Sequence, residues 1–344
     1  MPTLKELAAS TGYSPATISR ILTGDPDLAV SDETRRRVLE AAGRTNYAAT
    51  KSRRGRAPKS LMRLGLAEML TPAEQLADPY YLYLRNFVDQ ACLDQRFTLV
   101  PLPRRGEGFA APEGPAVDGV VAVGIFTPAQ IESLAAVSAN LVFLNSAPDD
   151  SRFDAVVLNL GLGIDLALDH LLELGHRRIG FLGPVEKLGH RKEPAPEPRR
   201  AKFIANLEAR GLLDPALLLP CPMDAQGAFR ALDAFLCGDL PAPTALVCAN
   251  EDIAIGALRC LNARGLPVPG RVSLVSFNDT PRSALVSPAL TSVSAHVEEM
   301  GRTAVRLAWE RGRQGDRTPV RSIPLKVVVP PALAVRESTA PPAT

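Results

Sequence analysis

The feature that most constrains the fold is a series of short, continuously apolar segments that recur after residue 60. The clearest is Gly119–Val123, which has the composition of a strand buried on both faces of a parallel sheet. Stretches of helical spacing, such as Tyr80–Gln95, separate these segments. The other predicted strands are Leu61–Leu70, Phe97–Leu102, Leu141–Leu144, Val156–Leu158, Ile179–Leu182, Leu246–Ala249 and Leu274–Phe277. This alternation predicts an α/β fold with two doubly wound parallel sheets.

Ligands of such sheets bind beyond the carboxyl ends of the strands, so polar residues that follow a strand are candidates for a site. Catalysis and cofactor binding find no support in the sequence. Gly161-Leu162-Gly163 begins like a dinucleotide fingerprint, but Leu166 stands where the third glycine is required. The sequence has no phosphate-binding loop and no nucleophile elbow, and its four histidines lack a metal-binding spacing. We therefore expect no catalytic residue, no metal and no cofactor.

Charge is distributed unevenly along the chain. The formal net charge is +2, but residues 1–60 carry +5 and the remainder carries −3. No acidic residue lies between Glu40 and Glu68, a stretch that holds seven basic residues. A basic end on a mildly acidic body is typical of a nucleic-acid-binding module joined to another domain, although a basic tail that only aids solubility has the same composition.

The cellular compartment is also indicated by composition. The five cysteines lack a paired spacing, which is typical of a reduced protein with incidental thiols. No apolar run is long enough to span a membrane, and the first residues do not form a signal peptide. We expect a cytoplasmic protein with no membrane partner.

The basic end has the start signals of three short helices. Thr3 followed by Glu6 fits a capping box, and Ser14-Pro15 supplies a capping residue and a first-turn proline to a second helix. Ser31-Asp32-Glu33 starts a third helix. Two short helices across a turn at Gly12, followed by a third, predict a helix-turn-helix unit; the alternative is an unrelated three-helix subdomain.

The second helix of such a unit enters the major groove of DNA. Pro15 and Ala16 would then read shape or thymine methyl groups, and Arg20 would fork onto a guanine or, alternatively, hold a phosphate. The hydroxyls of Ser14, Thr17 and Ser19 would bind phosphates and fix the register. Double-stranded DNA is therefore the expected partner of this end.

Three stretches near the start of the chain are specific in order and spacing: Thr3–Ala8, Gly12–Leu22 and Glu33–Ala42. They resemble the DNA-binding headpiece of the LacI/GalR family of bacterial repressors. The resemblance implies a headpiece at residues 1–46, in which Thr3 also contacts DNA, followed by a hinge at 47–60.

The expected hinge departs from the family pattern. Relatives insert a leucine from this segment into the minor groove, whereas this chain has no leucine in its hinge before Leu61. Arginines can enter a narrow minor groove without such a wedge. We therefore expect DNA contacts here, without a prediction of a sharp kink. The residues that would make them are Lys51, Arg53, Arg54 and Arg56.

Two stretches of the body, Leu171–Gly183 and Val335–Thr339, are similar to the same family. The resemblance implies an effector domain like that of periplasmic sugar-binding proteins, with two lobes joined by three crossovers and the ligand between them. The expected N-terminal lobe comprises residues 61–159 with 291–319. The expected C-terminal lobe comprises residues 160–290 with 320–339.

The resemblance also implies a set of ligand-binding residues: Tyr80, Tyr81, Asn145, Arg199, Asn250 and Asn278. The tyrosines would wall a sugar with their rings, although one of them, more readily Tyr81, can instead pack in the core. Arg199, with Arg200 as the fallback, offers a planar fork of donors. Each asparagine can bind a hydroxyl or serve instead as a turn residue. Because Asn145 and Asn278 stand where relatives have acids, we expect a neutral ligand.

Three further features are Asp25-Pro26, Asp78–Leu82 and Asn278-Asp279. They are similar to the branch of the family that represses an evolved β-galactosidase operon. This likeness implies a homodimeric repressor that binds a pseudo-palindromic operator and is released by a neutral sugar, such as a galactoside. Two other functions remain open at this point. One is a regulator that binds DNA more tightly with a purine or a protein partner, and the other is a sugar-binding transport protein, against which the headpiece argues.

Overall fold

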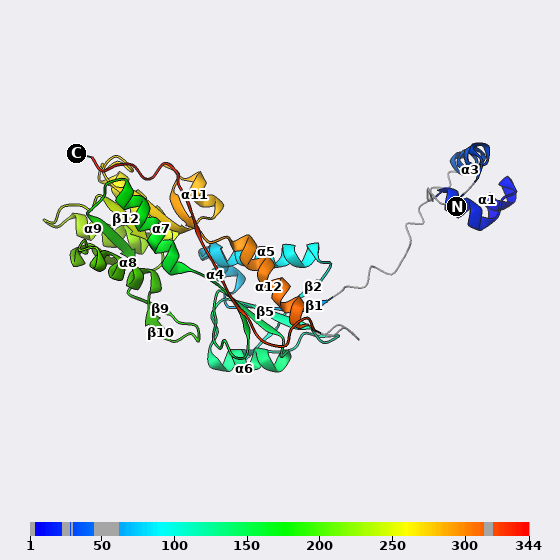
Figure 1. Cartoon of the computed structure of the whole chain (residues 1–344), viewed down its shortest axis with the longest axis horizontal. Helices are drawn as coiled ribbons and strands as arrows, with labels where there is room; N and C mark the ends of the chain where they lie inside the picture. Colours follow the sequence, from blue (N-terminus) through cyan, green and yellow to red (C-terminus); the bar gives the residue numbers. More distant parts are fainter. Residues whose placement is uncertain (1–3, 23–27, 29, 45–61, 313–318, 344) are drawn as a thin grey trace. The chain divides into compact units, whose positions relative to one another are not determined.

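The computed structural model describes residues 4–22, 28, 30–44, 62–312 and 319–343. They belong to two compact units, residues 1–59 and 60–344, each of which is described by itself (Figure 1). Several predicted DNA-binding residues lie outside the described residues, as does the predicted hinge at 47–60. These residues are Thr3, Lys51, Arg53, Arg54 and Arg56.

The first unit contains the helices α1 (Leu4–Thr11), α2 (Pro15–Leu22) and α3 (Asp32–Arg44). The Ser14 hydroxyl accepts a hydrogen bond from the backbone N–H of Thr17 over 3.1 Å and so caps α2, as predicted. Ser31 caps α3 in the same way, through the N–H of Thr34 at 3.2 Å. The apolar faces of the helices meet in a small core of Leu7, Ile18, Ile21, Val38, Ala41 and Ala42.

The first sheet of the second unit has six parallel strands in the order β15-β7-β6-β5-β1-β2. These strands are β1 (Arg63–Glu68), β2 (Thr98–Pro101), β5 (Gly119–Val123), β6 (Leu141–Leu144), β7 (Asp154–Leu158) and β15 (Lys326–Val329). Helices α5 (Pro79–Asp94) and α12 (Val297–Arg311) lie side by side on one face, and α6 (Pro128–Val137) covers the other (Figure 1). We call this sheet with its helices the first lobe.

Residues of β5 alternate between two cores, as a sheet covered on both faces requires. Val121 and Val123 pack toward α5 and α12, whereas Val120 and Ala122 pack toward α6. This burial explains why the whole segment is apolar.

The second sheet has the order β11-β8-β12-β13-β14-β16, in which only the pair β14–β16 is antiparallel. Its strands are β8 (Ile179–Gly183), β11 (Leu218–Pro220), β12 (Ala245–Cys248), β13 (Ser273–Asn278), β14 (Thr291–Ser294) and β16 (Ala332–Ala334). Its helices are α7 (Leu160–Glu173), α8 (Pro198–Ala209), α9 (Ala225–Leu236) and α10 (Glu251–Ala263). Helix α7 packs against α8, and α9 packs against α10. We call this sheet with its helices the second lobe.

Gly163 explains the incomplete dinucleotide pattern. A side-chain carbon at this position would approach Phe277 and Val293 to 2.9 Å. The glycine therefore allows α7 to lie close against the second sheet, which is a packing role.

The described chain passes between the two sheets three times, after β7, after β14 and after β15. The predicted lobe boundaries at 291 and 320 were wrong. Thr291–Ser294 pairs with β13 in the second sheet, so the chain returns to the first lobe only after Ser294. Lys326–Val329 pairs with β7 in the first sheet, so the last crossing follows Val329. A short apolar strand has the same composition in either sheet, and for that reason the sequence did not place these two.

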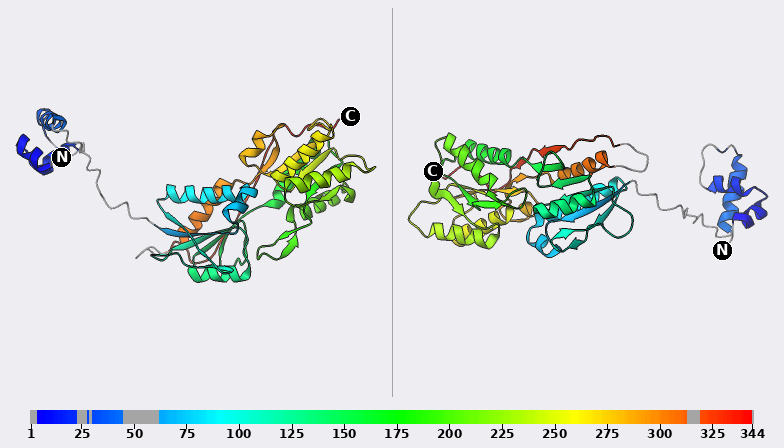
Figure 2. Two further views of the ribbon diagram at one scale, coloured as in Figure 1. Left: turned by 180° about the vertical axis from the view of Figure 1, so that it is seen from behind. Right: turned by 90° about the horizontal axis from the view of Figure 1, so that it is seen from below.

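The smaller elements are α4 (Pro72–Ala77), a 3₁₀ turn η1 (Pro215–Leu217), α11 (Pro281–Leu285), and two hairpins, β3 (Arg104–Arg105) with β4 (Gly108–Phe109) and β9 (Glu186–Leu188) with β10 (Pro194–Pro196). The hairpin β9–β10 projects from the second lobe in the front and back views (Figure 1, Figure 2). None of the helices in the described part of the chain is long and apolar enough to cross a membrane.

Candidate functional site

Tyr80, Tyr81 and Asn145 form one hydrogen-bonded group in the first lobe. The tyrosines lie in the first turn of α5, and Asn145 directly follows β6. Asn145 Oδ1 accepts a hydrogen bond from the Tyr80 hydroxyl, and Asn145 Nδ2 donates one to the Tyr81 hydroxyl, each over 3.1 Å. The two rings meet edge to face, with centroids 5.4 Å apart. The structure therefore brings three of the predicted residues together.

The two tyrosines differ in exposure. Tyr80 is 8% exposed and packs in the core beside Met300 of α12, whereas Tyr81 is half-buried. Core packing, the alternative that was expected more readily for Tyr81, applies chiefly to Tyr80, and Tyr81 packs against the same core while remaining partly exposed. Burial raises the pKa of both phenols above the usual value, so both hydroxyls keep their protons, and Tyr80 donates its proton to Asn145.

Arg199 lies in the first turn of α8 in the second lobe and is 6% exposed. Its Nε donates to Glu197 Oε1 over 2.7 Å, and its Nη1 donates to the carbonyl oxygen of Ala249. The guanidinium also lies over the ring of Phe277, 5.6 Å from the centroid. Ala249 follows β12 and Phe277 belongs to β13, so Arg199 is held at the carboxyl ends of two neighbouring strands.

Glu197 is the partner that the sequence analysis missed. Its carboxylate is fully buried, and its Oε2 accepts from the backbone N–H of Arg200 over 2.9 Å at the start of α8. One side chain thus caps the helix and fixes the guanidinium of Arg199. The sequence could have indicated this pair, because Glu197 stands two residues before Arg199 and a helix cap lies close to the side chains of the first turn.

Two more cations lie near Arg199. Burial, and to a smaller extent the charge of Arg199, lower the pKa of Lys187 on β9 to about 8, against the opposite effect of Glu197. Arg200, the predicted fallback, has a buried Nη1 without a hydrogen-bond partner. Lys187 was not among the predicted site residues.

Asn250 has the turn role that was the alternative for the asparagines. It precedes α10 and caps it, because its Oδ1 accepts from the N–H of Ile253 over 2.9 Å. Its Nδ2 donates to the carbonyl oxygen of Met223 over 3.4 Å. The side chain is 5% exposed. The amide nitrogen Nδ2 has two N–H groups, and the contact with Met223 uses one of them. The other is the group that a ligand would bind.

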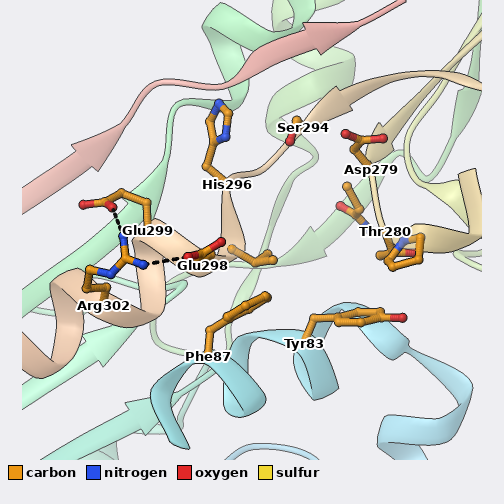
Figure 3. Close-up of a pocket in the computed structure, with 12 residues that line it drawn as sticks. Tyr83, Phe87, Asp279, Thr280, Ser294, His296, Glu298, Glu299 and Arg302 are labelled. Atoms are coloured by element: carbon orange, nitrogen blue, oxygen red, sulfur yellow. Dashed lines mark hydrogen bonds and ion pairs between the residues drawn. The ribbon is translucent and has the colours of Figure 1, made fainter. Parts of the chain in front are cut away.

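Asn278 ends β13 in a left-handed conformation with φ +96° and lines a pocket of about 420 Å³. The rings of Tyr83 and Phe87 on α5 face this pocket from one side, and His296 lies on the other (Figure 3). Asn278 is the only predicted ligand-binding residue that lines it. The pocket is therefore distinct from the group around Tyr81.

The sequence analysis also missed Glu251, which acts as a brace for the segment after Asn278. The buried carboxyl of Glu251, at the start of α10, accepts hydrogen bonds from the hydroxyls of Thr280 and Ser283. Burial raises the pKa of Glu251, against the effect of these two hydroxyls. The brace fixes the loop that carries Asn278 and Asp279.

Asp78, immediately before α5, connects the two lobes electrostatically. Burial raises the pKa of its carboxyl and Asp252 of the second lobe adds to this, whereas the N–H of Tyr80 and the charges of Arg199 and Arg282 lower it. The charge of Arg199 also lowers the pKa of Tyr81, although burial has the larger effect. The first-lobe tyrosines and the second-lobe arginine are therefore close enough to interact.

The described DNA-binding candidates lie on and before α2. Ser14, Pro15, Ala16, Ser19 and Arg20 are exposed, and Thr17 is half-buried. The Ser14 and Thr17 hydroxyls lie 2.8 Å apart, within hydrogen-bond distance of each other. Exposed side chains on this helix can reach a groove while Ile18 and Ile21 hold its opposite face in the core.

Known protein families match parts of both units of the chain. Residues 3–49 match the bacterial regulatory proteins of the lacI family, and residues 168–339 match the periplasmic binding protein-like domain. The HTH-type transcriptional repressor MelR of Bacillus subtilis is 30% identical over 98% of this chain and 97% of that protein. The HTH-type transcriptional regulator GanR of the same species is 31% identical over 92% of this chain and 95% of that protein.

A solved structure resembles the chain over its whole length. The structure of the transcriptional regulator CelR in complex with cellobiose matches with a TM-score of 0.65 at 25% identity. The match covers 98% of this chain and 100% of the CelR chain. The helix-turn-helix unit, the two parallel sheets and these matches confirm the predicted resemblance and fold class. The chain belongs to the LacI family of bacterial transcriptional regulators.

Proposed function

We propose that this regulator is a cytoplasmic, homodimeric repressor that releases its operator when a neutral sugar binds between the two lobes. A galactoside or a related oligosaccharide is the proposed class of ligand. Binding that involves both lobes would favour one arrangement of them, and the operator would bind the other.

The observation that carries this proposal is that Tyr81, bonded to Asn145 after β6, and Arg199, held at the carboxyl ends of β12 and β13, come from different lobes. A half-buried aromatic face suits the C–H surface of a sugar ring, and a guanidinium offers several donors in one plane to its hydroxyls. A site with both groups is chemically suited to a polyhydroxy ligand.

The neutral character of the ligand is supported by the groups around this pair. Asn145, which stands where relatives have an acid, supplies an uncharged amide beside Tyr81. The cation of Arg199 is already paired with Glu197. The CelR structure contains cellobiose, a neutral disaccharide, which agrees with the proposed class.

We further propose that residues 1–46 form the headpiece and residues 47–60 the hinge. Ser14, Pro15, Ala16, Thr17, Ser19 and Arg20 would contact the major groove and its phosphates, together with Thr3. Lys51, Arg53, Arg54 and Arg56 would contact the adjacent minor groove. Two copies of the chain would place two headpieces on the half-sites of a pseudo-palindromic operator.

The test begins with an operator selected from a random DNA library by the full chain. Fluorescence anisotropy then measures operator affinity with galactosides and cellobiose, each added separately at saturation. We expect at least one of these neutral sugars to weaken operator binding about tenfold or more, in line with ordinary coupling energies.

Other outcomes contradict specific parts of the proposal. An unchanged operator affinity across the panel would overturn the neutral sugar inducer. Tighter operator binding upon addition of a purine would mean that the chain is co-repressed. A monomer or a tetramer in light scattering would contradict the dimer.

A further inference from the structure

The hairpin β9–β10 leaves the second lobe and contacts the first. Its tip is the five-residue loop Gly189–Glu193 between the two strands. The backbone N–H of Ala147 in the first lobe donates a hydrogen bond to His190 Nδ1 over 3.1 Å. The Nε of Arg191 donates to the carbonyl oxygen of Pro148 over 2.8 Å. Two adjacent tip residues therefore hold two adjacent residues of the other lobe.

The tip is built to keep this shape. The N–H of Gly189 donates to the carbonyl oxygen of Glu193 over 2.7 Å, and the Glu193 carboxylate accepts from the N–H of Arg191 over 2.8 Å. A side-chain carbon on Gly189 would collide with the Glu193 carboxylate, so the glycine is what lets that carboxylate fold over the turn. Pro194 and Pro196 fix the backbone of the returning strand.

Both ends of the hairpin adjoin residues of the candidate ligand site. At the tip, Ala147 lies two residues after Asn145, which holds the hydroxyls of Tyr80 and Tyr81. At the base, Glu197 holds Arg199, and its backbone N–H donates to the carbonyl oxygen of Val185 over 3.0 Å. The hairpin thus joins the first-lobe and second-lobe halves of one site.

The tip contact depends on the protonation of His190. Nδ1 can accept the Ala147 N–H only when it carries no proton itself. Partial desolvation, then the charges of Lys326 and Lys187, lower the pKa of His190, while Glu193 and Asp150 oppose this. Lys326 is paired with Asp150 over 3.1 Å, and Arg191 and Lys192 are the other charges at the tip. The uncharged ring is therefore favoured near neutral pH, and in the tautomer protonated at Nε2 its Nδ1 accepts the Ala147 N–H.

We propose that the hairpin Glu186–Pro196 is a strap that ties the second lobe to the first beside the effector site and must release before the lobes separate. Its tip contacts hold the lobes in the ligand-binding arrangement in the absence of ligand. Loss of the strap then leaves a smaller fraction of the chains ready to bind, which weakens the apparent affinity for the effector. The proposal rests on the proposed function for the effector, its place between the lobes and its release of the operator.

The strap is tested first on the ligand-free, full-length protein. The exchange rate of the Ala147 amide hydrogen is measured from pH 5 to pH 8 by mass spectrometry with fragmentation. The protection factor is the intrinsic exchange rate at each pH divided by this measured rate. We expect the protection factor to be high at pH 8 and to fall below pH 6.5. A hydrogen bond of ordinary net strength corresponds to about a fivefold loss of protection.

Three variants separate the contact from general effects on folding. His190→Ala removes the acceptor and should lower Ala147 protection about fivefold at pH 8, to a level that no longer depends on pH. His190→Asn places an amide oxygen close to the position of Nδ1 and should keep the protection while abolishing its pH dependence. Glu186→Ala, on the exposed stem, should leave both unchanged. Ala147 protection that is the same in wild type and His190→Ala would overturn the strap.

The second measurement concerns the effector site. Operator release by the most active sugar of the panel is titrated for wild type, His190→Ala and Arg191→Ala. Each variant should need about fivefold more sugar for half-maximal release, and should bind the operator at least as tightly as wild type in the absence of sugar, because the operator binds the other arrangement of the lobes. Equal sugar requirements would overturn the coupling to the site. If no sugar acts on wild type while Ala147 protection behaves as expected, the proposed function fails and the strap stands.

Discussion

The side-chain amide of Asn145 donates a hydrogen bond to the hydroxyl of Tyr81 over 3.1 Å, and the same amide accepts one from Tyr80. Asn145 can do this because it has a left-handed backbone conformation, φ +76°, which asparagine tolerates better than most residues. The oxygen and the nitrogen of its side-chain amide are therefore both engaged in hydrogen bonds within the protein. We infer that Asn145 positions the tyrosines and that Tyr81 is the group of this cluster that contacts the ligand.

This assignment predicts the effect of removing the amide. Asn145→Gly keeps the left-handed backbone without strain but leaves the Tyr80 hydroxyl without its amide acceptor. We expect the free energy of unfolding to fall by about 1–3 kcal/mol, the cost of an unsatisfied buried polar group. Urea denaturation followed by circular dichroism measures it. Asn145→Asp is the control, because its carboxylate can accept from the Tyr80 hydroxyl as the amide does and from the Tyr81 hydroxyl in place of the lost Nδ2 donor. It should lose less, and equal losses would contradict the role of the amide.

Arg199 is expected to depend on the shape of its side chain as well as on its charge. Arg199→Lys cannot bond Glu197 and the Ala249 carbonyl with one planar group. We expect operator release to require about tenfold more sugar, which corresponds to about 1.4 kcal/mol. The matched control is Arg200→Lys, which leaves these contacts intact. A larger effect at Arg200 would make the fallback residue the ligand-binding arginine.

Arg20 is expected to read sequence. The side chain is exposed on α2, and a forked contact with guanine is worth about 1–3 kcal/mol of discrimination. Arg20→Ala should therefore weaken binding to the selected operator by about tenfold or more, and binding to random DNA by less. Anisotropy at one fixed salt concentration compares the two. An equal loss on both DNAs would assign Arg20 to a phosphate.

Asp154 should be important for the stability of the first lobe. Its carboxylate is fully buried at the start of β7 and accepts from Arg321 over 2.7 Å and 3.0 Å, from Arg311 over 3.2 Å and from the N–H of Leu325 over 2.6 Å. Asp154→Ala leaves two largely buried arginines without this carboxylate, so that among the described residues Arg321 keeps only the carboxylate of Glu310, and should cost about 3–5 kcal/mol.

The control for this prediction is Asp150→Ala, which removes an exposed ion pair with Lys326 and should cost less than about 1 kcal/mol. Urea denaturation followed by the fluorescence of Trp309, the single tryptophan of the chain, measures both variants in the lobe concerned. Similar losses in the two variants would show that the Asp154 network does not hold the lobe.

Stability should also fall at mildly acidic pH. His176 is 1% exposed and lies between Thr244 and the carbonyl oxygen of Ala340, at 3.0 Å and 2.9 Å. Burial lowers its pKa below 6.5, so the unfolded chain binds the proton more readily than the folded one. The free energy of unfolding should therefore be independent of this histidine above pH 6.5 and decrease as the pH falls below that value.

Urea denaturation between pH 8 and pH 5 measures this dependence. In His176→Asn the decrease should be smaller, and the part that persists belongs to His170 and His190, whose pKa values are lowered in the same direction. An identical pH profile in the variant would exclude His176 as its source.

Much of the fold could be predicted because its strands are buried on both faces. Gly119–Val123 and Leu141–Leu144 were predicted with the bounds that the structure has, since a strand covered by helices on both sides must be apolar throughout. The start of α2 was equally predictable, because a capping serine before a proline acts within a few residues. The sheet to which β14 and β15 belong was not, because pairing is not a local property.

The candidate site shows the same division. The sequence by itself determined the α/β class, the helix-turn-helix end and the residue types that follow the strands, since these depend on local pattern and spacing. Only the tertiary structure decided that Tyr80 is the buried tyrosine, that Asn250 caps α10, that Glu197 fixes Arg199, and that the hairpin at His190 reaches the other lobe. These are contacts between side chains from separate elements, and their geometry arises only when the sheets, helices and loops pack together.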